Sequence, residues 1–185
     1  YTKVFEEYGI PPWEPDEYKT KFRCDWRGLL ADMGLNGHVD QLIQIWDESK
    51  KSKQDELTLH EGAMQLLMDL KKDYYLGIVS SAPKHVLEQE LERLGVMDLV
   101  DLVLSDDDTE NKKPSPIPLL VAAEKAGFEP GECVYVGDMM EDVQSANAAG
   151  MHSIAVTWGI HERKLLEEQN PQKTVESISE LQDYI

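Results

Sequence analysis

The chain has 185 residues, of which 41% are hydrophobic and 29% are charged, and this balance is typical of a soluble globular protein. Its 18 basic and 36 acidic residues give a formal net charge of -18, which repels polyanions and argues against a nucleic-acid partner. No apolar run approaches the roughly 20 residues that a membrane helix needs, so no membrane role is expected.

The chain contains only two cysteines, Cys24 and Cys133, which lie far apart in the sequence. No apolar signal segment opens the chain, so neither a disulfide framework nor a cysteine zinc site is indicated. We therefore expect a cytoplasmic protein, present as a monomer or a homodimer.

Residues 1–57 have the apolar periodicity of helices. Apolar side chains recur at helical spacing from Val4 to Tyr8, from Leu29 to Met33 and from Val39 to Trp46. Gly and Pro residues separate the first of these stretches from the next. This first part of the chain is predicted to be an all-helical lobe.

From residue 58 onward, short apolar runs of strand length alternate with helical periods. This alternation predicts an α/β core, residues 58–185, with a parallel sheet built from βα units. The predicted strands are 75–79, 102–104, 133–136 and 154–156, and the predicted helices are about 83–94, 116–126, 140–149 and 177–184.

Polar residues follow three of the predicted strands, at the end of the sheet where α/β proteins bind ligands. Ser80 and Ser81 come directly after the first strand, and Pro83 then opens a helix. Hydroxyl and backbone N–H groups at a helix start can bind a phosphate. The alternative is that Ser80 only caps the helix, because serine is common at that position.

Lys113 follows the second strand, after an acidic loop that includes Asp106 to Asp108. Pro114 and Pro116 stiffen the chain just past Lys113, so its ammonium group could be aimed at a phosphoryl oxygen or a carboxylate. The alternative is an ordinary turn that opens a helix with proline. The acidic loop itself is expected to be solvated.

Asp138 stands at the tip of the third strand, and Asp142 lies one turn into the helix that follows. Gly137 allows a sharp turn of the backbone between strand and helix. Two carboxylates at this spacing suit Mg²⁺, which prefers carboxylate, water and phosphate oxygens. The alternative is that Asp142 only interacts with the helix dipole.

In their order and spacing, these residues closely resemble the motifs of the haloacid dehalogenase-like (HAD) phosphatase superfamily. Ser80 matches the second motif, Lys113 in Lys113-Pro114-x-Pro116 the third, and Gly137-Asp138-x-x-x-Asp142 the fourth. The resemblance covers residues 58–185 and is strongest to phosphoglycolate phosphatases. It implies a Rossmann-like parallel-sheet core, the HAD fold, and the helical lobe resembles the α-helical cap of that family.

The family's first motif, Asp-x-Asp-Gly-Thr, carries the nucleophilic aspartate on the first strand and has no match in the chain. The nearest string, residues 25–29, is predicted to be helical and has Arg27 where a carboxylate is needed. In the resembled fold, this strand lies between those that carry Ser80 and Asp138, and its loss would leave buried backbone groups unpaired. We expect roughly 20 residues that carry it to precede Tyr1 in the working protein.

With that strand present, the resemblance implies Mg²⁺-dependent hydrolysis of a small phosphorylated metabolite, such as phosphoglycolate or a sugar phosphate, through an aspartyl-phosphate. Asp138 would bind Mg²⁺, with Asp142 as a second ligand or behind it. Ser80 and Ser81 would bind the phosphoryl group, and Lys113 would offset its charge. The alternatives are a noncatalytic HAD-like binding or regulatory protein, a metal-free haloacid dehalogenase and, less favoured, a carbohydrate phosphomutase.

Overall fold

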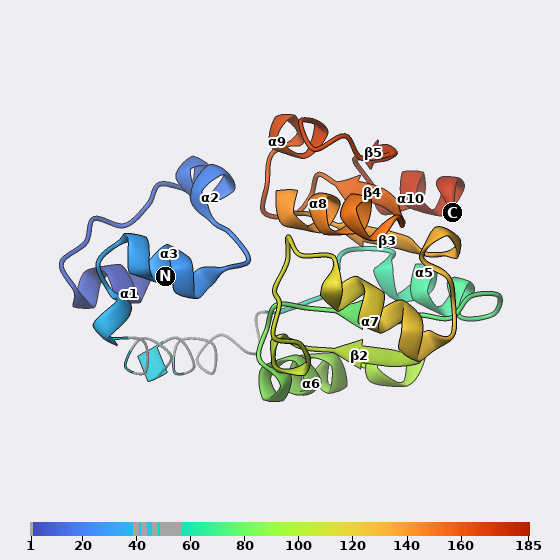
Figure 1. Cartoon of the computed structure of the whole chain (residues 1–185), viewed down its shortest axis with the longest axis horizontal. Coiled ribbons are helices and arrows are strands. Elements are labelled where there is room, and N and C mark those ends of the chain that lie inside the picture. Colours follow the sequence, from blue (N-terminus) through green and yellow to red (C-terminus); the bar gives the residue numbers. More distant parts are fainter. Residues whose placement is uncertain (1, 39–40, 42–43, 46–47, 49–56) are drawn as a thin grey trace. The chain divides into compact units, whose positions relative to one another are not determined.

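The computed structural model describes residues 2–38, 41, 44–45, 48 and 57–185 of the chain. These residues divide into two compact units, Tyr1–Thr58 and Leu59–Ile185. The predicted helix from Val39 to Trp46 lies largely outside the described residues. Figure 1 gives the element labels used below.

All regular elements of the N-terminal unit are helices among the residues that the structure describes. Phe5, Leu30 and Leu35 form its buried core, and Trp13 packs on Phe5 with the ring centroids 5.1 Å apart. Asp25 caps the third helix by accepting a hydrogen bond from the Gly28 N–H, so the string 25–29 is helical as predicted. The elements are α1 (Thr2–Glu7), α2 (Pro15–Lys21), α3 (Trp26–Asp32) and the 3-10 helix η1 (Asn36–His38).

The C-terminal unit alternates strands and helices, as the apolar pattern predicts. Its helices are α5 (Ala63–Leu70), α6 (Lys84–Arg93), α7 (Ile117–Ala126), α8 (Met140–Ala149), α9 (Arg163–Glu167) and α10 (Ile178–Tyr184). Its strands are β1 (Gly77–Val79), β2 (Leu102–Leu104), β3 (Val134–Gly137), β4 (His152–Val156) and β5 (Lys173–Val175). Short 3-10 helices lie between them at η3 (Met97–Leu99), η4 (Asp106–Asp108) and η5 (Pro130–Glu132).

The strands are parallel and form two sheets, β1-β2 and β3-β4-β5. Val79 lies opposite Leu104 in the first sheet, and Gly137 lies opposite Ala155 in the second. Helices pack on both faces, which is the arrangement expected for parallel strands. The α/β, Rossmann-like class that the sequence predicts is thus confirmed.

Alternate strand residues face different helices. Ile78 and Val103 pack with the cluster formed by α5 and α6, whereas Val79 packs with the cluster formed by α7 and α8. Helix α7 contacts β1 and β2, and α8 contacts β3 and β4. Because α7 also contacts α8, one helical layer joins the two sheets.

The apolar pattern of the sequence does not predict α5, α9 or β5. Strand β5 has only three residues, of which Val175 alone is fully buried, so it shows no apolar run. None of the helices among the described residues has the length and apolar character that a membrane crossing requires.

Candidate active site

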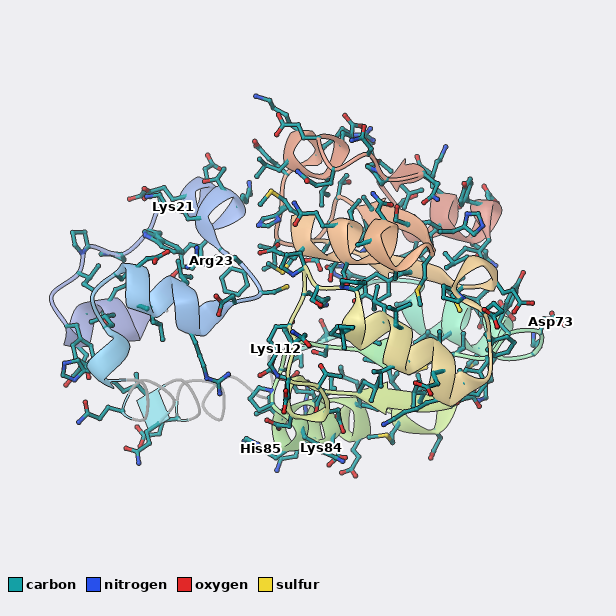
Figure 2. All side chains as sticks on the ribbon, viewed as in Figure 1. Lys21, Arg23, Asp73, Lys84, His85 and Lys112 are labelled. Carbon is teal, nitrogen blue, oxygen red and sulfur yellow. The ribbon has the colours of Figure 1, made fainter. Side chains whose placement is uncertain are left out.

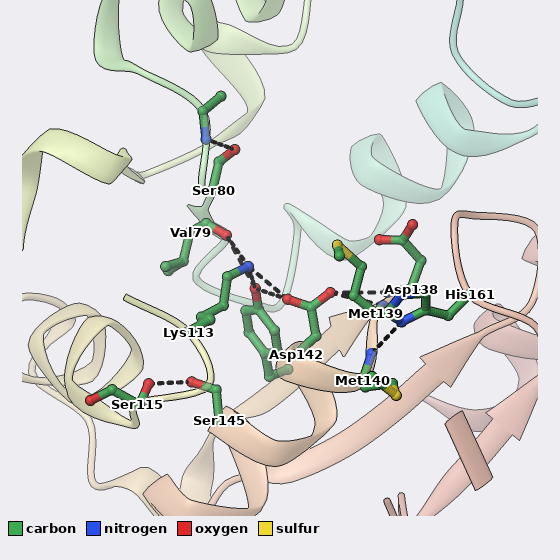
Figure 3. A network of polar contacts seen from close by, with 12 residues as sticks. Val79, Ser80, Lys113, Ser115, Asp138, Met139, Met140, Asp142, Ser145 and His161 are labelled. Atoms are coloured by element: carbon green, nitrogen blue, oxygen red, sulfur yellow. Dashed lines mark hydrogen bonds and ion pairs between the residues drawn. The ribbon is translucent and has the colours of Figure 1, made fainter. Parts of the chain in front are cut away.

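The candidate site lies at the carboxyl ends of β1 and β3, where the chain passes into α6 and α8. In open parallel sheets this is the end at which ligands bind, because loops and helix N-termini converge there. Figure 3 shows that a network of polar contacts connects the end of β1, the Lys113 loop and the start of α8.

Lys113 occupies the centre of this network and is 7% exposed. Its Nζ lies 2.6 Å from Asp142 Oδ1 and 3.0 Å from the Tyr135 hydroxyl, with a longer contact of 3.5 Å to the Val79 carbonyl. The peptide bond between Lys113 and Pro114 is cis. Such a buried ammonium group is matched by a buried carboxylate, as burial of a charge requires.

Asp142 connects Lys113 to the tip of β3. Its Oδ1 accepts from Lys113, and its Oδ2 accepts from the backbone N–H groups of Asp138 and Met139 at 3.2 and 3.1 Å. A side chain on Gly137 would collide with this arrangement, because a Cβ there would lie 2.3 Å from the Asp142 Cβ. Glycine at position 137 therefore lets the buried carboxylate approach the strand.

Asp138 is half-buried at the end of β3. Its Oδ2 accepts a hydrogen bond of 2.7 Å from the Ile160 N–H in the loop after β4. Its backbone is held on one side by Asp142 and on the other by the His161 N–H, which donates to the Asp138 carbonyl at 3.1 Å. The carboxylate of Asp138 is therefore held by the loop after β4, and its backbone is held by that loop and by Asp142 of α8.

Ser80 lies next to this network, directly after Val79, and its hydroxyl accepts from the Ala82 N–H at 3.1 Å (Figure 3). The hydroxyl thus makes a hydrogen bond within its own loop. It does not cap α6, because the N-cap of that helix is Pro83. Ser81 is half-buried in the same loop. The sequence placed both serines at the end of β1, but the orientation of the Ser80 hydroxyl could not be read from it.

Side chains of both charges lie at this end of the unit. Figure 2 shows Lys84, His85 and Lys112 at one end of the C-terminal unit and Asp73 at the other. Lys112 pairs with Asp106 at 3.3 Å, so part of the acidic loop is neutralised. Hydrogen bonds from the Ser105 side chain and backbone hold the pKa of Asp108 below its ordinary value.

Three residues of the network had no role in the sequence analysis. Tyr135 donates to the Val79 carbonyl at 3.1 Å and contacts both Lys113 and Asp142. His161 is fully buried and accepts from the Met140 N–H at the start of α8. Ser145, on α8, donates to the Ser115 carbonyl at 2.7 Å and so ties that helix to the Lys113 loop.

The donor set at this site suits a hard cation with few protein ligands. No group of three or more His, Cys, Asp and Glu side chains in the described ranges is arranged to hold a metal ion. Mg²⁺ commonly takes only one or two carboxylates and fills its other positions with water and phosphate oxygens. The Asp138 carboxylate therefore fits Mg²⁺ bound together with a phosphorylated ligand, whereas both oxygens of Asp142 already accept hydrogen bonds from Lys113 and from backbone N–H groups.

The fold places the chain among the α/β proteins with parallel sheets, a class in which ligands commonly bind where the strands end. The sequence profile of the haloacid dehalogenase-like hydrolases matches residues 1–156. The chain therefore belongs to that family, and the resemblance found in its sequence is confirmed.

Curated relatives carry the names of phosphatases. The chain is 36% identical over 106 residues to the phosphoglycolate phosphatase of Escherichia coli, a match that covers 57% of this chain and 42% of that protein. It is 32% identical over 151 residues to the pyrophosphatase PpaX of Bacillus velezensis, covering 80% of this chain and 70% of that protein. The first match thus spans less than half of the relative's length.

Solved structures share the fold over nearly the whole chain. A protein from Lactobacillus plantarum superposes with a TM-score of 0.86 at 25% identity, covering 99% of this chain and 87% of that one. A haloacid dehalogenase-like family hydrolase from Streptococcus pneumoniae superposes with a TM-score of 0.80 at 20% identity, covering 100% of this chain and 87% of that one.

Proposed function

We propose that this chain acts in a Mg²⁺-dependent phosphatase that hydrolyses a small phosphate monoester through an aspartyl-phosphate intermediate. The observation that carries the proposal is the buried contact between Lys113 and Asp142, whose other oxygen holds the backbone of Asp138. It brings the third and fourth motifs of the family together at the ends of the strands. The phosphatase names of the relatives support the same class of reaction.

The nucleophile in this proposal belongs to a strand that lies between β1 and β3. In the part of the chain that the structure describes, β1 pairs only with β2 and β3 only with β4. Val134 and Val136 of β3 are 47% and 36% exposed, although valines of parallel sheets are normally covered on both faces. A further parallel strand would satisfy the backbone groups of both edges.

Catalysis of phosphoryl transfer depends mostly on positioning and electrostatic stabilisation, and each residue of the site would contribute to one of these. Lys113 would offset the charge of the phosphoryl group and of the attacking carboxylate. Ser80, with its hydroxyl turned away from the Ala82 N–H, would donate to a phosphoryl oxygen, and Ser81 would add a backbone or hydroxyl donor.

Asp138 would bind Mg²⁺ through Oδ1, because Oδ2 already accepts from the Ile160 N–H. Asp142 would not contact the ion and would instead support Asp138, since both Asp142 oxygens have hydrogen-bond partners in the network. The bound ion would supply positive charge for the phosphoryl oxygens. The helical N-terminal unit would act as the cap that selects a substrate such as phosphoglycolate or a sugar phosphate.

The test is a phosphatase assay with p-nitrophenyl phosphate, phosphoglycolate and sugar phosphates. It compares the 185-residue chain with the same chain extended upstream by a strand that carries the Asp-x-Asp-Gly-Thr motif. We expect Mg²⁺-dependent hydrolysis from the extended protein only, and its loss on chelation. Asp138→Asn should lower turnover by about 100-fold or more, because a lost metal ligand removes several kcal/mol of charge stabilisation.

Asp73→Asn is the matched control, because it removes the same charge at the opposite end of the unit (Figure 2). It should leave turnover unchanged. Turnover that survives Asp138→Asn would remove this residue from the site. An extended protein that hydrolyses none of the esters would favour a noncatalytic binding or regulatory role.

A further inference from the structure

Three consecutive residues in the loop after β4, Gly159 to His161, contact Asp138 or the start of α8. The loop lies far from Asp138 in the sequence, and no motif discussed above includes it. It nevertheless donates two hydrogen bonds to Asp138, one to the carboxylate and one to the backbone carbonyl. Figure 3 shows the His161 side chain directed at the Met140 N–H beside Asp138.

His161 holds the turn from β3 into α8 at two points. Its backbone N–H donates to the Asp138 carbonyl at 3.1 Å, and its ring Nδ1 accepts from the Met140 N–H at 2.8 Å. A backbone N–H can only donate, so Nδ1 carries the lone pair and the ring proton is on Nε2. The imidazole is 1% exposed, which confines it to this orientation.

Ile160 and Gly159 lie directly against the Asp138 side chain. The Ile160 N–H donates to Asp138 Oδ2 at 2.7 Å. A Cβ on Gly159 would lie 2.2 Å from both the Cβ and Oδ2 of Asp138, so only glycine allows this close approach. The Asp138 carboxylate is therefore held with Oδ2 against the loop and Oδ1 directed away from it.

We propose that His161 is a positioning residue for Asp138, acting by pinning the loop 159–161 to the first turn of α8. When Nδ1 accepts from Met140, the Ile160 N–H is kept in place against Asp138 Oδ2. The metal-binding part of this inference rests on the proposed function, whereas the part that concerns the Ile160 hydrogen bond does not. Residues that orient a metal ligand commonly change metal affinity by about 10- to 100-fold.

The experiment uses three variants of the full 185-residue chain. His161→Asn places an amide oxygen near the position of Nδ1 and keeps the acceptor for Met140. His161→Gln places its amide near Nε2, and His161→Leu fills the site without any acceptor. The Asn and Gln variants both lose the ring, and Asn is smaller than Gln. Better protection in the Asn variant would therefore report the position of the acceptor rather than a smaller loss of volume.

The first readout is amide hydrogen exchange by NMR, which needs no metal. We expect His161→Gln and His161→Leu to lower the protection of the Ile160 and Met140 amides by at least about 10-fold, while amides of β2 keep theirs. His161→Asn should retain most of the protection. Unchanged protection of the Ile160 amide in both the Gln and Leu variants would overturn the inference.

The second readout is Mn²⁺ binding, followed by electron paramagnetic resonance. We expect affinity to fall about 10-fold or more in His161→Gln and to recover in His161→Asn. Asp138→Asn serves as the reference. If Asp138→Asn leaves Mn²⁺ binding intact, the proposed metal site fails, and the exchange data alone decide the role of His161. If Asp138→Asn weakens binding and His161→Gln and His161→Leu do not, the inference fails and the metal site stands.

Discussion

At the scale of single residues, Tyr135 explains how a lysine can be buried at this site. An ammonium group has three N–H donors, and Lys113 directs them at Asp142, Tyr135 and the Val79 carbonyl. The Tyr135 hydroxyl also contacts Val79 and Asp142, so it connects Lys113 with both of its other partners. In the sequence, Tyr135 is one apolar residue of a strand, and nothing local indicates where its hydroxyl lies.

We predict that Tyr135→Phe lowers the free energy of unfolding by about 1–2 kcal/mol, because it removes a hydrogen bond to a buried charged group. Urea unfolding measures the change. Tyr74→Phe is the control, since the Tyr74 hydroxyl donates to the Ile185 carbonyl from a side chain that is half exposed. That variant should lose less than about 0.5 kcal/mol. Equal losses in the two variants would contradict the role assigned to Tyr135.

The sequence indicated where the polar residues of the site stand, because each follows an apolar strand. Lys113 and Asp142 were separate signals in the sequence, and the structure joins them through a hydrogen bond between residues 29 positions apart. Two features could not be predicted. The Ser80 hydroxyl accepts from the Ala82 N–H, which is one of several local hydrogen bonds open to a serine in a loop. His161 packs against the start of α8, and that contact depends on tertiary packing.

At the scale of elements, the turn from β3 into α8 depends on a glycine, whereas the start of β1 does not. A Cβ on Gly137 would lie 2.3 Å from the Asp142 Cβ, whereas a Cβ on Gly77 would meet its nearest atom, in Leu102, at an ordinary 3.8 Å. The two strand glycines therefore form a matched pair. One is required by a close approach, and the other has room for a methyl group.

Gly137→Ala is predicted to lower the free energy of unfolding by about 1–3 kcal/mol or more, because the methyl group must displace the buried Asp142. Gly77→Ala should change it by less than about 1 kcal/mol, since alanine fits there and restricts the unfolded chain. Thermal unfolding of both variants, followed by circular dichroism, tests the contrast. A Gly137→Ala protein as stable as Gly77→Ala would mean that Asp142 is not held against the strand.

Strands with three or more apolar residues were predicted close to their observed positions, because parallel strands buried on both faces form nearly continuous apolar runs. Helices α6, α7 and α8 were predicted within one or two residues of their ends, since proline or glycine marks them. Strand β5 and helix α9 escaped prediction, because each is short and buries little: Val175 and Leu166 are their fully buried residues.

At the scale of the whole molecule, the main feature is the division of the parallel sheet into two. Among the described residues its consequence is a pair of open edges, which we define as the edges of β1 and β3 that face away from β2 and β4. Exposed aromatic residues precede both strands: Tyr75 comes shortly before β1 and Phe128 shortly before β3. Their rings contact each other, with the ring centroids 5.8 Å apart. Open strand edges with apolar side chains are sites at which chains pair with one another.

We therefore predict that the 185-residue chain associates with itself as its concentration rises, and that this is seen as an increasing sedimentation coefficient. Val134→Lys should suppress the association, because a charged side chain on an open edge disfavours pairing with another strand. Met68→Lys is the control: it places the same charge at a similarly exposed position on α5. Extension of the chain by the proposed first strand should suppress the association as Val134→Lys does, because that strand would pair with both edges. Association that persists in the extended protein but disappears in Val134→Lys would place the contact on the exposed face of β3 and leave the open edges without a role.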